Sequence, residues 1–289
     1  MRARWSLLWL ALAPLPLLAV DYRMQASVAW AENYSRTSHA PTIREATIYT
    51  AHGFAAHARQ LNSRWLLLAE LDAGFEHVPD YRALDQVNAH GQLTLRRKFG
   101  LGPMAPVVDL SAGVARVAFR EHGRSGWRSE ATLAVSKRLT PEWRIGASGS
   151  WEKFDASHTT FDIQHRRFAV ETHWHASERL TLSAGAARQW GRLVANAAWP
   201  IWSQAIAGGF GPVVSSYYNS IPWEISHTFG PGWVAYRVDC TADFWWTEAS
   251  FTLNDRTRIP LRYESARVVN RIDVRYNTSV VSLGVLHRF

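Results

Sequence analysis

Two short stretches of the chain contain residue types used in catalysis or metal binding. A single residue, Ala176, separates His175 from Ser177. Nucleophilic catalysis uses a serine beside a histidine, and a third group orients the histidine. Glu171, His173 and His175 alternate along one segment, and imidazole and carboxylate groups on one face can bind zinc. No orienting third group is visible, and neighbouring histidines are more often ordinary polar side chains. We therefore predict no catalytic site, no metal site, no cofactor and no enzymatic activity.

The N-terminus has the composition of a secretory signal. Arg2 and Arg4 precede an apolar run that ends near Val20 and contains two prolines. Such a run is shorter than the roughly 20 apolar residues of a spanning helix. Residues 1–20 are therefore interpreted as a signal peptide, preferably cleaved after Ala19, and residues 21–289 as the mature chain. No later apolar stretch is long enough for a transmembrane helix.

The mature chain alternates between apolar and polar residues. In the segment 127–139, Trp127 and Leu133 share one parity, while Arg128 and Glu130 share the other. A period of two is typical of a strand. The predicted strands are 22–33, 45–58, 64–76, 86–99, 107–119, 127–139, 143–153, 162–175, 179–192, 216–229, 233–246 and 277–289.

Short and long connections between these segments follow one another in turn. The short ones carry Gly, Pro, Asn and Ser, as hairpin turns do. They are centred on 61–63, 101–106, 140–142, 176–178 and 230–232, and the long ones lie near 35–43, 77–85, 121–126, 154–161, 194–215 and 247–276. Twelve strands joined in this way would have both ends on the side of the short turns.

One strand breaks the alternation. In 107–119, Val108 and Leu110 share one frame, whereas Val117 and Phe119 share the other. A β-bulge near Ala115 would bring both sets to the same face. We therefore expect a bulge at this point.

The chain ends on the strand-like segment 277–289, NTSVVSLGVLHRF, in which Leu283, Val285 and the terminal Phe289 share one parity. A lone strand of this kind would be an aggregation edge, and closure of a barrel gives it a second partner. On this terminal segment and the strand rhythm, the chain resembles Gram-negative outer-membrane β-barrels. The resemblance implies an all-β fold, a closed antiparallel transmembrane barrel of about twelve strands with short periplasmic turns and longer extracellular loops. It also implies a location in the bacterial outer membrane, where Phe289 is read by the barrel-assembly machinery.

In such a barrel the charged parity must face the lumen, because an Arg or Lys facing lipid at the midplane costs roughly 2 to 4 kcal/mol. The predicted lumen-lining residues are Glu70, Asp72, Arg96, Lys98, Arg128, Glu130, Arg144, Glu171, His173, Arg237, Asp239 and Asp243. Cations and anions are nearly balanced among the inward positions. A one-sided basic track for acidic sugars is therefore not predicted.

Composition agrees with this architecture. The formal net charge of +8 falls to +6 when Arg2 and Arg4 leave with the signal, and aromatic girdles at the two bilayer interfaces would use the 15 tryptophans. Cys240 is the single cysteine, so the chain has no internal disulfide. The arginine-rich stretch 247–276 suits anionic lipopolysaccharide outside the cell, and an extra hairpin within it is also possible. The apolar stretch 194–215 could fold inward as a constriction or rest on the rim.

The sequence therefore favours a narrow pore for small polar solutes, or a transport-associated barrel. One alternative is a structural or assembly barrel that conducts nothing and binds a periplasmic partner or a surface polysaccharide. Another is a lipid-modifying enzyme, since the pair His175 and Ser177 is similar to the His-x-Ser pairing of outer-membrane phospholipase A. The chain lacks the Asn-Gly that follows in that family, and its pair falls at a short turn. Nucleic acid is not an expected partner.

Overall fold

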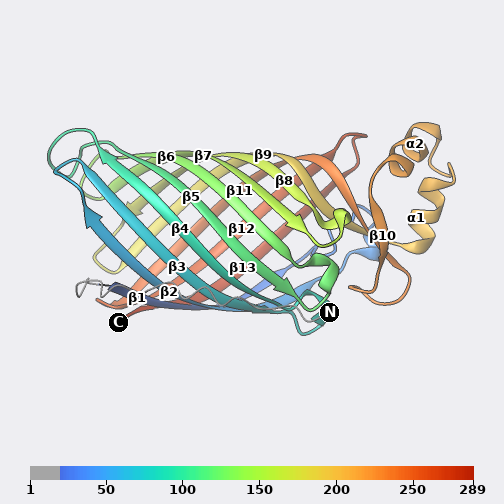
Figure 1. Cartoon of the computed structure of the whole chain (residues 1–289), viewed down its shortest axis with the longest axis horizontal. Coiled ribbons are helices and arrows are strands. Elements are labelled where there is room, and N and C mark those ends of the chain that lie inside the picture. Colours follow the sequence, from blue (N-terminus) through green and yellow to red (C-terminus); the bar gives the residue numbers. More distant parts are fainter. Residues whose placement is uncertain (1–19) are drawn as a thin grey trace, which may run out of the picture.

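The computed structural model describes residues 20–289 and consists mainly of antiparallel strands (Figure 1). The strands are β1 (Val20–Ala31), β2 (Ala46–Gln60), β3 (Trp65–His77), β4 (Gln86–Lys98), β5 (Val107–Phe119), β6 (Gly126–Arg138), β7 (Trp143–Ala156), β8 (Ile163–His175), β9 (Leu180–Ala198), β10 (Trp223–Ser226), β11 (Trp233–Asn254), β12 (Thr257–Asn270) and β13 (Arg275–Arg288). The predicted signal peptide, apart from Val20, lies outside the described residues.

Every strand except β10 belongs to the wall of a closed barrel. Consecutive strands pair as antiparallel neighbours, β9 pairs directly with β11, and β1 pairs with β13 from Arg23↔Arg288 to Ala31↔Val280. The predicted twelve-stranded closed antiparallel barrel is therefore confirmed. Alternation along each strand produces this wall: in β6, Trp127 and Leu133 are exposed on the outside, whereas Glu130 is half-buried on the inside.

The two ends of the barrel differ. Residues 61–64, 99–106, 139–142, 176–179 and 255–256 connect strands at the end that also holds the start of β1 and the C-terminus, which we call the turn end. The opposite end, the loop end, holds 32–45, 78–85, 120–125, 157–162, 199–232 and 271–274. Four of these loops contain short 3-10 helices: η1 (Ala40–Thr42), η2 (Arg82–Leu84), η3 (His122–Arg124) and η4 (Thr159–Phe161). No helix within residues 20–289 is long and apolar enough to cross a bilayer.

Two predicted segments are wrong. Residues 216–229 are not a wall strand, and 247–276 is not a loop, because most of it forms the end of β11 and all of β12. In β12, Leu261 and Tyr263 face outward and alternate with the inward Arg262 and Glu264. This high charge resembles a solvated loop in sequence, although Arg262 and Glu264 belong to the inner wall and Arg267 is the register partner of the outward Asp243. The predicted turn at 230–232 consequently lies at the loop end.

The bulge predicted in β5 is also absent. β5 pairs with β4 and β6 without a shift of register. Val117 and Phe119 point inward near the loop end, where they pack in an apolar cluster with Phe154. Arg116 points outward and lies 5.7 Å from the centroid of the Trp127 ring. The mixed pattern therefore reflects a locally apolar interior.

β9 and β11 continue past their neighbours at the loop end. β9 stops pairing with β8 at Gly191 and β11 stops pairing with β12 at Cys240, but the two strands stay paired with each other. We call this extension, residues 192–198 and 233–239, the tongue. The tongue leaves the barrel wall at the point where β9 loses its pairing with β8 and β11 loses its pairing with β12.

The tongue is buried on both faces. Consecutive residues Val234 and Ala235 point to opposite sides, and both are 0% exposed. Ala235 packs with Phe161 of the β7–β8 loop, while Val238 clusters with Val268 of β12. A two-stranded ribbon standing in solvent would leave a face open. The tongue therefore lies inside the mouth of the barrel.

The segment between the two strands of the tongue covers the loop end (Figure 1). It contains α1 (Trp199–Ile206) and α2 (Pro212–Ser220), each with a proline in its first turn, where a missing N–H costs nothing. Trp202 is almost fully buried, with ring centroids 5.3 Å from Tyr218 and 4.8 Å from Tyr236. β10 then pairs with the start of β11.

Candidate functional site: the lumen and its mouth

A chain of titratable side chains runs around the inner wall. His52 Nδ1 lies 3.0 Å from a carboxylate oxygen of Asp72, and His90 lies 4.0 Å from the other oxygen. His90 Nε2 is also 3.3 Å from Glu130 Oε1. Four groups from β2, β3, β4 and β6 are thus brought into one network.

Two glycines make this network possible. His52 lies over Gly74, where an added Cβ would come within 2.4 Å of the ring, and His90 lies over Gly113, where it would come within 2.6 Å. Because Gly113 has no side chain, His90 reaches across β5 to Glu130 on β6. Small residues on the intervening strands therefore let charged side chains pair along the wall.

Other inward charges form pairs between strands. Arg96 donates two hydrogen bonds of 2.8 Å to Asp109 on the neighbouring β5, and Arg23 on β1 bonds Glu70 on β3. Arg128 Nε lies 3.7 Å from Glu152. Charge-assisted contacts of this kind hold the side chains against the wall and satisfy their polar groups.

Nine of the twelve predicted lumen residues occupy inward positions of the wall. They are Glu70, Asp72, Arg96, Lys98, Arg128, Glu130, Arg144, Glu171 and His173. Lys98 and Arg144 lie beside the turn end, and His173 contacts Ser183 at 2.9 Å and Glu171 at 3.3 Å.

The three predicted residues of β11 lie elsewhere, so their assignment to the inner wall is corrected. Asp243 points outward and pairs with Arg188 at 2.6 Å. Asp239 belongs to the tongue and pairs with Arg192 at 3.4 Å. Arg237 also belongs to the tongue and donates a 2.7 Å hydrogen bond to the carbonyl of Thr159.

The physical reason is that β11 carries aromatic residues on its inner face. Phe244 and Trp246 point inward, where the guanidinium carbon of Arg167 lies 4.8 Å and 5.5 Å from their ring centroids. Trp245 and Phe251 point outward and are exposed. Polarity alone assigns the two faces of this strand the wrong way round. Alternation predicts that Arg167 on β8 faces inward, but it does not predict that Phe244 and Trp246 are its partners.

The first loop, residues 32–45, folds into the mouth. Asn33 and Ser35 are buried, and Asn196 of the tongue donates a 3.0 Å hydrogen bond to the Ser35 carbonyl. Arg36 follows with φ of 54°, a left-handed conformation that is uncommon outside glycine. This turn directs Arg36 toward the lumen, a placement that sequence alternation could not reveal.

Two cavities occupy the interior near the loop end. The upper cavity has a volume of about 360 Å³ and is lined by residues such as Glu76, Arg124 and Phe229. The middle cavity has a volume of about 450 Å³ and is lined by residues such as Arg167, Phe244 and Tyr276. Both cavities share the lining residues Tyr34, Arg36, Ile48 and Ile163. These four residues mark the boundary between the two spaces.

Polar contacts tie residues 199–232, which we call the cover, to the loops on the far side of the mouth. Arg124 donates hydrogen bonds to Glu121 at 2.6 Å and to Thr228 at 3.0 Å. Thr228 in turn donates to Glu121 at 2.9 Å, and His158 lies 3.1 Å from Glu224 of β10. Burial lowers the pKa of Arg124, although the neighbouring Glu121 carboxylate opposes this shift. The contacts form a clamp across the mouth.

The residue types that suggested catalysis have separate partners. His175 Nδ1 lies 2.9 Å from Thr181 Oγ1, whereas Ser177 Oγ accepts the backbone N–H of Leu180 at 3.1 Å. Within residues 20–289, no group of three or more His, Cys, Asp and Glu side chains could hold a metal ion. The turn at 176–179 therefore has a structural explanation in its own hydrogen bonds.

No protein-family model and no curated protein matches the sequence. Among solved structures, the COG4313 outer membrane channel from Pseudomonas putida F1 is similar, with a TM-score of 0.60 and 11% identity over 95% of this chain and 97% of that one. The fold is that of an outer-membrane β-barrel. The NanC porin has a TM-score of 0.46 and 8% identity, covering 92% of this chain and 100% of that one, and is too distant to carry further argument.

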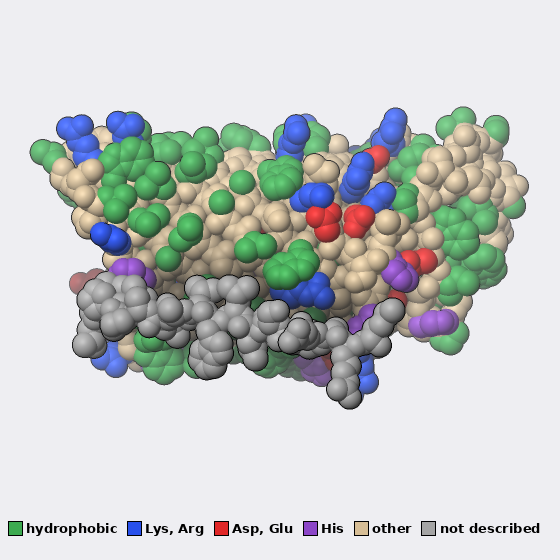
Figure 2. All heavy atoms as spheres, viewed as in Figure 1, with side chains coloured by type: hydrophobic (Ala, Val, Ile, Leu, Met, Phe, Trp, Pro, Cys, Tyr) green, Lys and Arg blue, Asp and Glu red, His purple; other side chains and the backbone are tan. Residues whose placement is uncertain are grey.

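The outside of the barrel suits a lipid surrounding. Figure 2 shows hydrophobic side chains spread along the wall and charged ones gathered mainly toward its two ends. Exposed aromatic side chains such as Trp143 and Trp174 lie near the turn end, and Trp127 and Trp190 lie nearer the loop end. Such residues anchor a barrel at membrane interfaces.

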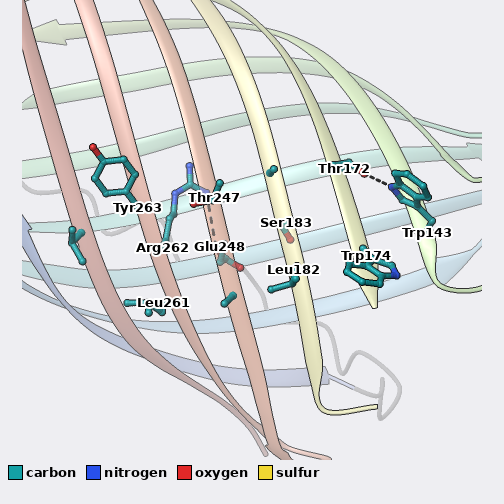
Figure 3. A pocket seen from close by; sticks show the side chains of 13 residues that line it. Trp143, Thr172, Trp174, Leu182, Ser183, Thr247, Glu248, Leu261, Arg262 and Tyr263 are labelled. Carbon is teal, nitrogen blue, oxygen red and sulfur yellow. Dashed lines mark hydrogen bonds and ion pairs between the residues drawn. The ribbon is translucent and has the colours of Figure 1, made fainter. Parts of the chain in front are cut away.

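A further hollow of about 890 Å³ lies at the wall near the turn end (Figure 3). Small outward residues such as Ala184 and Thr247 line it together with larger ones such as Trp174, Leu261 and Tyr263. These side chains have the outward parity, and Ser183, Glu248 and Arg262, which have the inward parity, line the hollow as well.

Proposed function

We propose that the protein is a narrow pore of the bacterial outer membrane that passes small polar solutes. The observation that carries the proposal is the pair of charged interior cavities that meet at Tyr34, Arg36, Ile48 and Ile163. A barrel filled only for stability would have no need of a cationic side chain, Arg36, at a boundary between two open spaces. A twelve-stranded wall is also wider than the eight-stranded kind, whose interior side chains fill.

In this proposal the turn end faces the periplasm and the covered loop end faces outward, as in barrels with short periplasmic turns. Phe289 would be read by the barrel-assembly machinery during insertion. Its backbone N–H donates a 3.0 Å hydrogen bond to the Tyr22 carbonyl, so the last residue lies at the seam where the barrel closes. Lipopolysaccharide would surround the loop end.

Single-channel recording in planar bilayers tests the pore. Purified wild-type protein should give small stepwise currents. A variant in which residues 199–232 are replaced by Asn-Gly should give steps at least twofold larger, because the cover is gone. Ala198 and Trp233 are directly opposed partners, so a two-residue hairpin turn can join them without changing the register.

The buried tongue supports a second candidate, a barrel that conducts nothing and binds a periplasmic partner or a surface polysaccharide. If neither the wild type nor the shortened variant gives stepwise currents, the pore is refuted and the filled barrel is favoured. A lipid-modifying enzyme is not proposed, because His175 and Ser177 contact different partners.

A further inference from the structure

Two arginines face the middle cavity without a carboxylate partner. Arg36, from the first loop, and Arg167, from β8, both line this space of about 450 Å³. Within residues 20–289, neither side chain forms a salt bridge or a hydrogen bond to a carboxylate, unlike Arg23, Arg96 and Arg128. A guanidinium group that faces a cavity can bind an anion, and within the described residues no carboxylate has that role for Arg36 or Arg167.

The carboxylates that line the same cavity are already paired. Glu264 accepts a 2.6 Å hydrogen bond from Arg262 on its own strand, and Glu152 lies 3.7 Å from Arg128. Arg192 is balanced in the same way by Asp239. The cavity therefore has a surplus of positive charge, which comes from Arg36 and Arg167.

Aromatic rings hold Arg167 in place. Its guanidinium carbon lies 4.8 Å from the Phe244 centroid and 5.5 Å from the Trp246 centroid. Trp246 in turn lies over Gly185, where a Cβ would come within 2.2 Å of the indole. A cation held against ring faces keeps its N–H edge available for a bidentate contact with a carboxylate.

The rest of the cavity wall is largely apolar. Phe244, Val268 and Tyr276 line one part of it, and Leu193 of the tongue lines another. A bare inorganic anion would leave these surfaces in contact with water, whereas an organic body would cover them. The volume falls within the range of roughly 300 to 1,000 Å³ that is common for small-molecule sites.

We propose that the middle cavity binds a small organic monocarboxylate, with its carboxylate on Arg36 and Arg167 and its apolar body against Phe244 and Tyr276. The inference rests on the proposed pore, which gives the anion its route to the cavity. It narrows the solute class from small polar molecules to small organic anions. Inorganic phosphate and neutral amides of the same shape should be poor ligands.

Isothermal titration calorimetry on the full-length protein in detergent micelles tests the site, with titrations into empty micelles as blanks. The probes are benzoate, its neutral counterpart benzamide, and inorganic phosphate. Benzoate should bind at least tenfold more tightly than either of the others. Arg167→Gln and Arg36→Gln should each weaken benzoate binding about tenfold, whereas Arg188→Gln, on the outward pair with Asp243, should not.

The Arg36 variant keeps the test decisive if the Arg167 variant fails to fold, because Arg36 lies in a loop outside the strand pairing. Equal binding of benzoate and benzamide would overturn the site, as would unchanged benzoate binding in the arginine variants. Binding by a protein that passes no current would keep the site and reject the pore. Stepwise currents without benzoate binding would keep the pore and reject the site.

Discussion

Glycine residues determine how far single polar side chains reach along the lumen. His90 pairs with Glu130 across Gly113, and a Cβ at that position would come within 2.6 Å of the ring and 3.2 Å of Glu130 Cγ. Gly113→Ala should therefore displace His90 and destabilise the barrel by about 1 to 3 kcal/mol, the usual cost of overpacking. Urea unfolding in micelles, followed by tryptophan fluorescence, would measure this loss.

Gly53→Ala is the matched control, because a Cβ there meets nothing within 4 Å. It should leave the unfolding midpoint nearly unchanged. Equal midpoints for the two variants would show that His90 moves aside at no cost, and the network would then contribute little to the wall.

The sequence predicted the two carboxylates of this network, but neither its two histidines nor the contacts among the four groups. Alternation places Asp72 and Glu130 on inward positions, because the apolar residues next to each of them in the same strand belong to the other face. Pairing across β5 depends on register and on Gly113, which local pattern does not encode. Arg36 could not be found in this way, because its position follows from a left-handed turn in a folded loop.

At the scale of elements, Gly191 marks the point where β9 leaves the wall. Its φ is 143°, and a Cβ would come within 2.2 Å of the Gln164 carbonyl oxygen and 2.6 Å of His165 Cα. Gly191→Ala should cost at least about 1 to 3 kcal/mol, because backbone atoms cannot move aside as a side chain can. The temperature at which the folded form disappears on unheated gels should fall.

Gly149→Ala, with nothing within 4 Å of the added Cβ, serves as the control for that substitution. The two variants should differ clearly in the gel assay. If Gly191→Ala is as heat-resistant as the control, the departure of the tongue from β8 does not depend on this glycine.

The clamp across the mouth gives a second prediction for the tongue and its cover. Arg124 bonds Glu121 and Thr228 and lies 4.1 Å from the Phe161 ring centroid. Arg124→Gln should weaken the closed cover by about 1.5 to 3 kcal/mol, the usual contribution of hydrogen bonds to a charged group. Planar-bilayer records should then show longer or more frequent open events than the wild type.

Arg120→Gln changes the same charge in the same loop, but Arg120 is exposed and forms no side-chain hydrogen bond or salt bridge within residues 20–289. Its records should match the wild type. Identical gating in both variants would mean that Arg124 does not hold the cover closed.

The elements that the sequence predicted wrongly are those whose composition resembles that of another kind of element. β12 contains Arg258, Arg262 and Arg267 within ten residues, and this density of arginine resembles a loop. α2 begins at Pro212 and buries Tyr218 against Trp202, so its apolar residues pack on a helix rather than on a wall. Strands with a lipid face and a polar inner face, such as β6, were predicted nearly to their ends.

At the scale of the molecule, the count of twelve wall strands was correct although one member was wrong. The missed β12 replaces the predicted strand 216–229, and the turn at 255–256 replaces the one at 230–232. Closure fixes an even number of strands when both ends of the chain lie at the turn end. An error in one hairpin was therefore compensated by another, and the predicted side of the termini was unaffected.

The orientation of the whole barrel can be tested with single cysteines and a maleimide polyethylene glycol too large to cross the outer membrane. Cys240 is buried, so the wild-type background should be low. Val213 on α2 is 71% exposed at the loop end, and Leu101 is 88% exposed at the turn end. Val213→Cys should be labelled on intact cells, whereas Leu101→Cys should be labelled only after the outer membrane is permeabilised. The reverse labelling pattern would place the tongue and the cover in the periplasm. They would then lie at the periplasmic opening of the proposed pore and not at its extracellular opening.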